Sequence, residues 1–174
     1  MTASLVWVLR RARAHTLALA ADLSDQMMCR QHRPGERHPA WLLGHLVLAD
    51  VYLLHLLGVE PLPEDFPALL SAHGPRSTPT ADLDAYSSRS ALVTRLEQTG
   101  IRRTLAIGAM SAADLGAAVP EPFLAKSQPT LEHHVQGLVF HEGYHAGQLS
   151  SWRRSHGLPP VFWQLAKPLE IPSR

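Results

Sequence analysis

Two histidines and a glutamate near the end of the chain have the spacing of a zinc-protease motif. The segment HEGYHAGQL, residues 141–149, contains His141-Glu-x-x-His145. On a helix, residues four apart emerge about 40° apart and one turn apart along the axis, so two imidazoles in this relation can share one metal ion. In metalloproteases with this motif the glutamate, here Glu142, acts as general base. The motif therefore raises the question whether the chain is a protease.

The sequence after the motif argues against a protease. Zinc proteases take their third ligand downstream, where this chain offers His156 and Glu170 as candidate donors. His156 follows His145 by eleven residues, which places it roughly 16 Å further along the same helix. Glu170 lies in a tail flanked by prolines. Neither residue is well placed to bind the same ion.

A third histidine lies far upstream, on another apolar segment. His45 is in WLLGHLVLAD, with Trp41 one helical turn before it. Helix bundles build metal sites from side chains that project inward from facing helices. We therefore predict that His45 meets His141 and His145 across the core, where three histidines would leave an open coordination position. For the His-x-x-x-His pair alone, two buried histidines satisfied by hydrogen bonds remain the alternative interpretation.

Several residues beside the histidine pair are candidates for supporting roles. Gln148 lies seven residues after His141 and is a candidate hydrogen-bond donor to a ligand or substrate, or a helix-packing residue. For Glu142, a hydrogen bond to a ligand imidazole or a structural ion pair is favoured over general-base chemistry. Gly143 and Gly147 each cost about 1 kcal/mol against alanine in a helix, so we expect a close helix approach there.

The remaining histidines and two arginines have weaker cases. His38 and His134 precede His45 and His141 by seven residues each, so either could line the mouth of a pocket. Five others are expected to face solvent or to form local hydrogen bonds: His15, His32, His55, His73 and His133. Arg153 and Arg154 favour the helix dipole at a C-terminal end, and binding of an anionic thiol cofactor there is a minor alternative.

Four long helices must position these residues. Apolar residues from Leu5 to Leu23 recur in steps of four and three, which predicts a first helix of about 20 residues. Pro39 begins the second, Thr80 caps the third and Thr130 caps the fourth. Gly100 is an alternative, earlier end for the third helix. The predicted ranges of the last three helices are 39–57, 80–105 and 130–156.

The connections between these helices are rich in proline. Residues 59–79 contain five prolines and predict an extended crossover connection between helices two and three. Residues 111–114 predict a short capped turn, and residues 119–129 predict a loop. The tail, 161–174, is apolar enough to pack on the helices or against a second subunit. The chain is therefore predicted to form one all-α domain over residues 1–174, a four-helix bundle with a long second connection.

The composition limits the classes of partner. The chain has 174 residues, of which 45% are hydrophobic and 18% charged, with a net charge of +1. This balance gives no reason to expect nucleic acid or a membrane surface as partner. Arginines interrupt the apolar N-terminus, so we expect no signal peptide, and we identify no apolar run of the roughly 20 residues that span a bilayer. The single cysteine, Cys29, fits a reducing compartment, and we expect a cytoplasmic protein with an inert thiol.

Two segments resemble a known family. The stretch HEGYHAGQLSSWRRSHGLP is similar to the His-x-x-x-His-x-Gly-Gln signature of the DinB-like (DinB/YfiT) superfamily, and HPAWLLGHL is similar to its second-helix histidine segment. The order of the helices and the long connection also fit, so the resemblance spans most of the chain. It implies a four-helix bundle with a divalent metal, nickel or zinc most often, held by His45, His141 and His145, and commonly a homodimer.

The reaction is less uniform in this superfamily than the fold. Relatives include transferases and isomerases that use low-molecular-weight thiols, and many members are described only as metal-dependent hydrolases. The leading hypothesis is a metal-dependent transferase that acts on a small-molecule substrate with such a thiol. A non-catalytic, stress-associated metal-binding dimer and a metal-dependent hydrolase remain the alternatives. Spacing alone does not separate activation of a thiol from activation of water, so a thiol S-transferase and a hydrolase both stay open if the protein is an enzyme.

Overall fold

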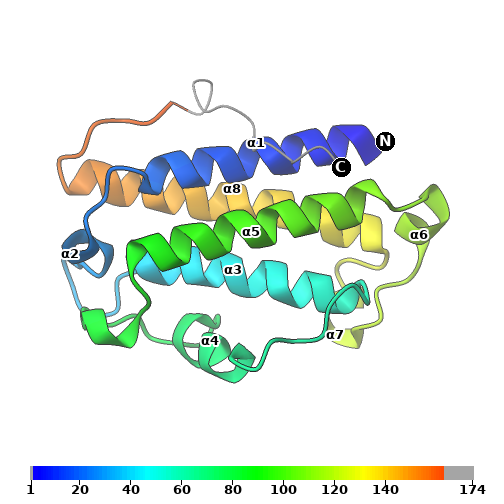
Figure 1. Ribbon diagram of the computed structural model, residues 1–174, viewed down its shortest axis with the longest axis horizontal. Coiled ribbons are helices and arrows are strands. Elements are labelled where there is room, and N and C mark those ends of the chain that lie inside the picture. Colours follow the sequence, from blue (N-terminus) through cyan, green and yellow to red (C-terminus); the bar gives the residue numbers. More distant parts are fainter. Residues whose placement is uncertain (1, 163–174) are drawn as a thin grey trace.

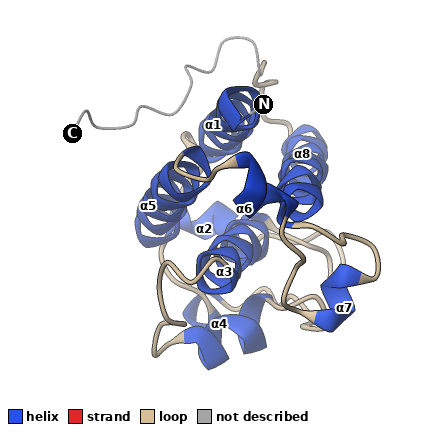
Figure 2. Ribbon diagram, turned by 90° about the vertical axis from the view of Figure 1, so that its right-hand side faces the viewer, coloured by secondary structure: helices blue, strands red, loops and turns tan. Residues whose placement is uncertain are grey.

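Four long helices lie side by side in the computed structural model, which describes residues 2–162. They are α1 (Thr2–Ala20), α3 (Pro39–Leu56), α5 (Arg89–Gly108) and α8 (Leu131–Ser155). Both α1 and α3 pack against α5 and α8, and the end-on view of Figure 2 shows the four at the corners of a square. Within residues 2–162 there is no strand, so the predicted all-α fold class is confirmed.

Two of the predicted helix starts are confirmed by their capping groups. Nδ1 of His38 accepts a hydrogen bond from the backbone N–H of Trp41 at 3.3 Å, and Pro39 follows as the first helical residue of α3. At the start of α8, the Thr130 hydroxyl accepts from the backbone N–H of His133 at 3.4 Å. These caps fix where α3 and α8 begin, and with them the register of the histidines that they carry.

The third helix begins nine residues later than predicted. Asp82 caps a 3-10 turn, η1 (Leu83–Ala85), and the Tyr86 hydroxyl accepts from the backbone N–H of Thr80 at 3.1 Å. These local bonds hold residues 80–88 out of a helix, and Ser88 caps α5 instead. Gly100 does not end the helix, because α5 continues to Gly108.

Two connections contain helices that the sequence analysis predicted as loop. The 59–79 connection contains α4 (Phe66–His73), which packs against α3. A proline near its start, Pro67, favours helix initiation, whereas we had interpreted it as a helix breaker. The 119–129 loop contains the single turn α7 (Pro122–Ala125). The predicted capped turn is confirmed as α6 (Ala112–Gly116), with a capping box between Ser111 and Asp114.

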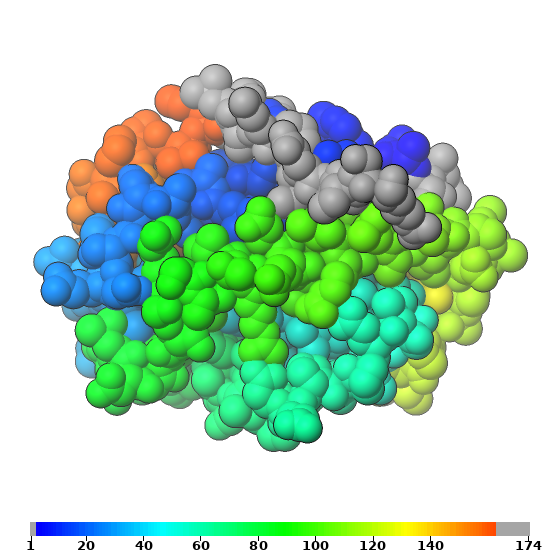
Figure 3. Space-filling model, in the orientation of Figure 1, coloured from blue at the N-terminus to red at the C-terminus, as the bar shows by residue number. Residues whose placement is uncertain are grey.

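The core lies between the four long helices. The larger of two apolar clusters contains residues from all four long helices. The short helix α2 (Asp25–Met28) also contributes to this cluster, near the end of α1. Figure 3 shows one face of the molecule, where residues of α5 (green) and of the 59–79 connection (teal) lie at the surface. The tail predicted to pack on the helices lies outside the described residues beyond position 162.

Helix α3 is the most apolar of the four. It is long enough to cross a membrane, with a mean hydropathy of 1.4 over 18 residues, but 78% of that stretch is buried inside the protein. We had expected no apolar run of this length from the sequence, where His45 and Asp50 interrupt the apolar residues of this segment. Core packing accounts for its apolar character, and the same packing surrounds His45 with other helices.

Four charged side chains, one from each long helix, form an ion quartet inside the core. The quartet is Arg13, Asp50, Arg103 and Glu142, each side chain at most 2% exposed. Arg13 contacts Asp50 at 2.8 Å and Glu142 at 2.6 Å, and Arg103 contacts the same carboxylates at 2.6 and 3.0 Å. Because each arginine bridges both acids, the charges balance and the four helices are tied together at one level.

Candidate metal centre

The structure brings together the three histidines selected from the sequence. His45 from α3 and His141 and His145 from α8 place one ring nitrogen each within 4.8 Å of the others. Nε2 of His141 lies 3.0 Å from Nε2 of His45 and 3.0 Å from Nε2 of His145. Among residues 2–162, these three form the group of donors that could hold a metal ion.

The other nitrogen of two rings is held by an acceptor. Nδ1 of His45 lies 2.7 Å from the carbonyl oxygen of His73, and Nδ1 of His145 lies 2.8 Å from Oε1 of Gln148. Since both partners are acceptors, both Nδ1 atoms carry a proton and both Nε2 atoms present a lone pair. Such orientation by an outer hydrogen bond is typical of histidines that bind metals.

Hydrogen bonds within the trio cannot satisfy both short contacts. His141 can carry a single proton on Nε2, which can be donated to only one of the lone pairs of His45 and His145. The second 3.0 Å contact then leaves two lone pairs facing each other. A cation at the centre would instead accept all three lone pairs, so the donor set fits a divalent metal that binds imidazole.

The three rings are neutral at neutral pH. Burial, and after it the neighbouring His45, lower the pKa of His141 to about 4. Burial also lowers the pKa of His145 to about 3, with His141 as the next cause. The pKa of His45 is lowered by burial and by the positive charge of Arg37. Protons therefore do not compete with a metal for these nitrogens near pH 7.

Trp41 fixes the plane of the His45 ring. The two rings are stacked with centroids 4.7 Å apart and an interplanar angle of 11°. The indole is itself buried, and its N–H donates to the Ser77 hydroxyl at 2.7 Å. Because Trp41 and His45 are one turn apart on α3, the helix sets this stacking, which keeps one face of the ligand ring dry.

Helix α4 supplies the acceptor for His45, and a glycine allows it to do so. A Cβ atom on Gly44 would lie 2.1 Å from two atoms of the His73 ring, so only glycine permits the ring to pack there. His73 is buried, at 4% exposed, whereas it was expected to be solvent-facing or locally hydrogen-bonded. That expectation was wrong because it did not foresee that α4 would pack on α3.

Glu142 faces away from the three histidines and into the ion quartet. Its Oε1 accepts from Nε of Arg13 at 2.6 Å and its Oε2 from Nη2 of Arg103 at 3.0 Å, and the Thr16 hydroxyl also donates to Oε1. Burial alone would favour the protonated acid, but the two arginines outweigh it and lower the pKa of Glu142 to about 2. The contacts of Glu142 are those of a structural ion pair, which is one of the roles that the sequence suggested for this residue.

Other candidates lie apart from the trio. His38 caps α3, and His134 contacts Gln128 at 2.6 Å. Arg153 is buried and forms an ion pair with Asp22, so it is not available to an anionic cofactor.

Gly143 and Gly147 do not serve a close helix approach among the described residues. No neighbouring atom of the described residues lies within 4 Å of a Cβ atom built at either position, and both residues are exposed. The expected helix contact was therefore wrong for the described part of the chain.

The partners of Glu142 were not predicted from the sequence. Arg13 lies in the apolar N-terminal segment, and Asp50 lies in the segment around His45. A charged residue at a core position of an amphipathic helix was the available signal, since buried charges need partners. Arg103 gave a similar signal on the third helix.

An all-α chain whose long helices bring three imidazoles together, two of them oriented by outer hydrogen bonds, is a candidate metal-binding helical protein. The sequence profile of the DinB superfamily matches residues 9–149, which include His45, His141 and His145, and the chain belongs to this superfamily. A search of the curated proteins found no match to the chain.

Proposed function

We propose that His45, His141 and His145 bind one divalent metal ion, nickel or zinc, and that the protein is a metal-dependent transferase that uses a low-molecular-weight thiol. The main evidence for the metal site is the convergence of three Nε2 atoms. Two of these atoms present a lone pair, because the Nδ1 atom of the same ring donates its proton to an acceptor. Imidazole nitrogen is a preferred ligand of both metals.

Three protein ligands favour a catalytic role over a structural one. Structural zinc sites are closed by four protein ligands, whereas catalytic sites keep a position for water or substrate. When bound, the metal would lower the pKa of a thiol or water held in that position. The chain's own residues orient the site: Trp41 shields the His45 ring, and Gln148 holds the His145 ring.

The position of Glu142 favours a thiol over water as the nucleophile. The motif glutamate of a zinc protease removes a proton from water, but here the carboxylate is buried and paired with two arginines. A thiol has a much lower pKa than water and needs less help from a base. The hydrolase and the non-catalytic metal-binding protein remain the competing hypotheses.

The cellular setting is part of the proposal. A buried, unpaired Cys29 is compatible with the reducing cytoplasm. Phe140 and Tyr144, on the outer side of α8, are 76% and 51% exposed, which is compatible with a homodimer.

A thermal-shift and turnover experiment separates the three hypotheses. The metal-loaded protein is incubated with small thiols, and then with a thiol and an electrophile, and His141→Ala is the metal-site variant. We expect thiols to raise the melting temperature of the wild type only when metal is present, and we expect metal-dependent loss of free thiol. Metal binding without any thiol effect would favour the non-catalytic protein, and metal-dependent ester or amide hydrolysis would favour the hydrolase.

A further inference from the structure

A groove lies beside the metal centre, between residues 33–37 and the last turns of α8. It has a volume of about 440 Å³, within the range of small-molecule sites. The loop contributes two arginines and a glutamate, and α8 contributes an amide, two hydroxyls and an indole. The lining residues are Arg33, Pro34, Gly35, Glu36, Arg37, Gln148, Ser151, Trp152 and Ser155.

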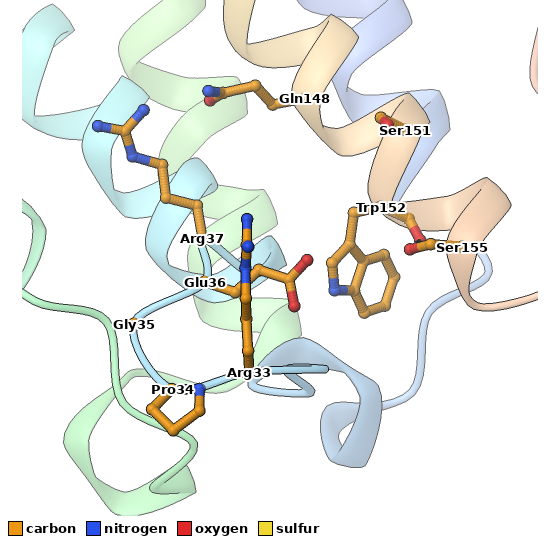
Figure 4. A pocket seen from close by; sticks show the side chains of 9 residues that line it. All are labelled: Arg33, Pro34, Gly35, Glu36, Arg37, Gln148, Ser151, Trp152 and Ser155. Carbon is orange, nitrogen blue, oxygen red and sulfur yellow. Dashed lines mark hydrogen bonds between the residues drawn. The ribbon is translucent and has the colours of Figure 1, made fainter.

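Gln148 belongs to both the groove and the metal centre. Its Oε1 accepts from Nδ1 of His145 at 2.8 Å, and its side chain lines the groove. That hydrogen bond uses the amide oxygen, so the two N–H donors of the amide nitrogen remain for a ligand. In Figure 4 the side chains of Gln148 and Arg37 extend toward the same side of the groove.

Arg37 places a positive charge on the side of the groove where Gln148 lies. Its guanidinium carbon lies 4.9 Å from the centre of the Trp41 ring, and Trp41 stacks on His45. The guanidinium of Arg37 is therefore separated from a ligand histidine by the Trp41 ring alone. No carboxylate among residues 2–162 forms an ion pair with Arg37.

The groove is suited to an anion with a single charge. Glu36 lines it with Arg33 and Arg37, and its Oε2 accepts from the backbone N–H of His32 at 2.7 Å. Two guanidinium groups and one carboxylate leave one excess positive charge. One negative charge on a ligand balances this excess, and the planar fork of an arginine can bind a carboxylate through two parallel hydrogen bonds.

We propose that this groove binds the carboxylate of an acidic small thiol, which Arg37 and the amide nitrogen of Gln148 hold while the thiol end reaches the three histidines. This assignment rests on the proposed function, because the thiol is what joins the groove to the metal centre. Gln148 then has two partners, the ligand carboxylate and the ring of His145, so it positions the substrate relative to a metal ligand.

Two thiols that differ only in charge test the assignment. Nickel-loaded protein is titrated with 3-mercaptopropionate and with 3-mercaptopropionamide, and the thiolate-to-nickel absorption band reports binding. We expect the acid to bind about tenfold more tightly than the amide, as for one charge-assisted contact. Arg37→Gln should abolish this preference, whereas Lys126→Gln should keep it, because Lys126 is an exposed cation that does not line the groove.

The outcomes separate failure of the groove from failure of the proposed function. Equal affinities for the acid and the amide, or an unchanged preference in Arg37→Gln, would overturn the groove assignment and leave thiol binding intact. An absence of the absorption band with both thiols would count against the proposed function. In that case calorimetric titration of butyrate, a carboxylate with a single charge, decides the groove: tighter binding to the wild type than to Arg37→Gln supports it, and equal or no binding overturns it.

Discussion

Replacement of Gly44 by alanine tests whether α4 orients the ligand His45. The new Cβ atom would lie 2.1 Å from two ring atoms of His73 and 2.5 Å from a third, whereas ordinary contacts begin at 3.4 Å. The ring must therefore move by more than about 1 Å, the difference between these distances. His73 is buried, so we expect α4 to move with the ring.

The expected cost appears in both stability and metal affinity. Overpacking of this kind destabilises a fold by about 1–3 kcal/mol. Movement of α4 also draws the carbonyl of His73 away from Nδ1 of His45, a 2.7 Å hydrogen bond in the wild type. Loss of such an outer partner lowers metal affinity by about 10–100-fold. Thermal unfolding of the metal-free protein measures the first effect, and competition with a chelator measures the second.

A second substitution tests whether the ring of His73 causes the loss of metal affinity. Because the clash is with the ring alone, Gly44→Ala combined with His73→Ala should recover most of the metal affinity, since the backbone carbonyl remains. Gly147→Ala is the matched control: no atom of residues 2–162 lies within 4 Å of its Cβ, so it should be neutral or stabilising. Wild-type metal affinity in Gly44→Ala, or no recovery in the double variant, would refute the role assigned to α4.

Three further predictions follow from buried groups. Glu142→Gln should destabilise the protein by about 3–5 kcal/mol in denaturant unfolding, because Arg13 and Arg103 would then share Asp50 alone and one buried positive charge would be uncompensated; a stable variant that lacks only turnover would instead indicate a catalytic glutamate. Without metal, stability should fall as the pH decreases from about 6.5 toward 4, because the unfolded chain binds protons at His141 and His145 before the folded chain does. A urea midpoint that rises on acidification would contradict this sign. Burial raises the pKa of the Cys29 thiol to about 11, so native protein at pH 7.5 should resist alkylation by iodoacetamide, whereas rapid modification would show that the thiol is accessible.

The long helices and the histidine trio were predictable because they depend on regular spacing. Apolar periodicity and capping residues identify α3 and α8, since Pro39 and Thr130 stand where helices start. His141 and His145 share a face by helix geometry alone. Placing His45 opposite them required only that two apolar faces meet in one core.

The supporting groups were not predictable in the same way, because they depend on how the elements pack. The carbonyl of His73 carries no side-chain signal, and its role arises from the contact between α4 and α3. Arg13 and Asp50 are isolated charges in the sequence and become partners only when the rotation of each helix is known. The late start of α5 reflects local bonds around Thr80 that compete with a helix.

Metal content tests the central claim most directly. Protein reconstituted with nickel or zinc is freed of excess metal, and the bound metal is measured by mass spectrometry. We expect one ion per chain in the wild type and in His55→Ala, an exposed histidine on α3. Alanine at position 45, 141 or 145 should remove most of the ion while circular dichroism shows a folded protein. Undiminished metal in these three variants would contradict the three-histidine centre.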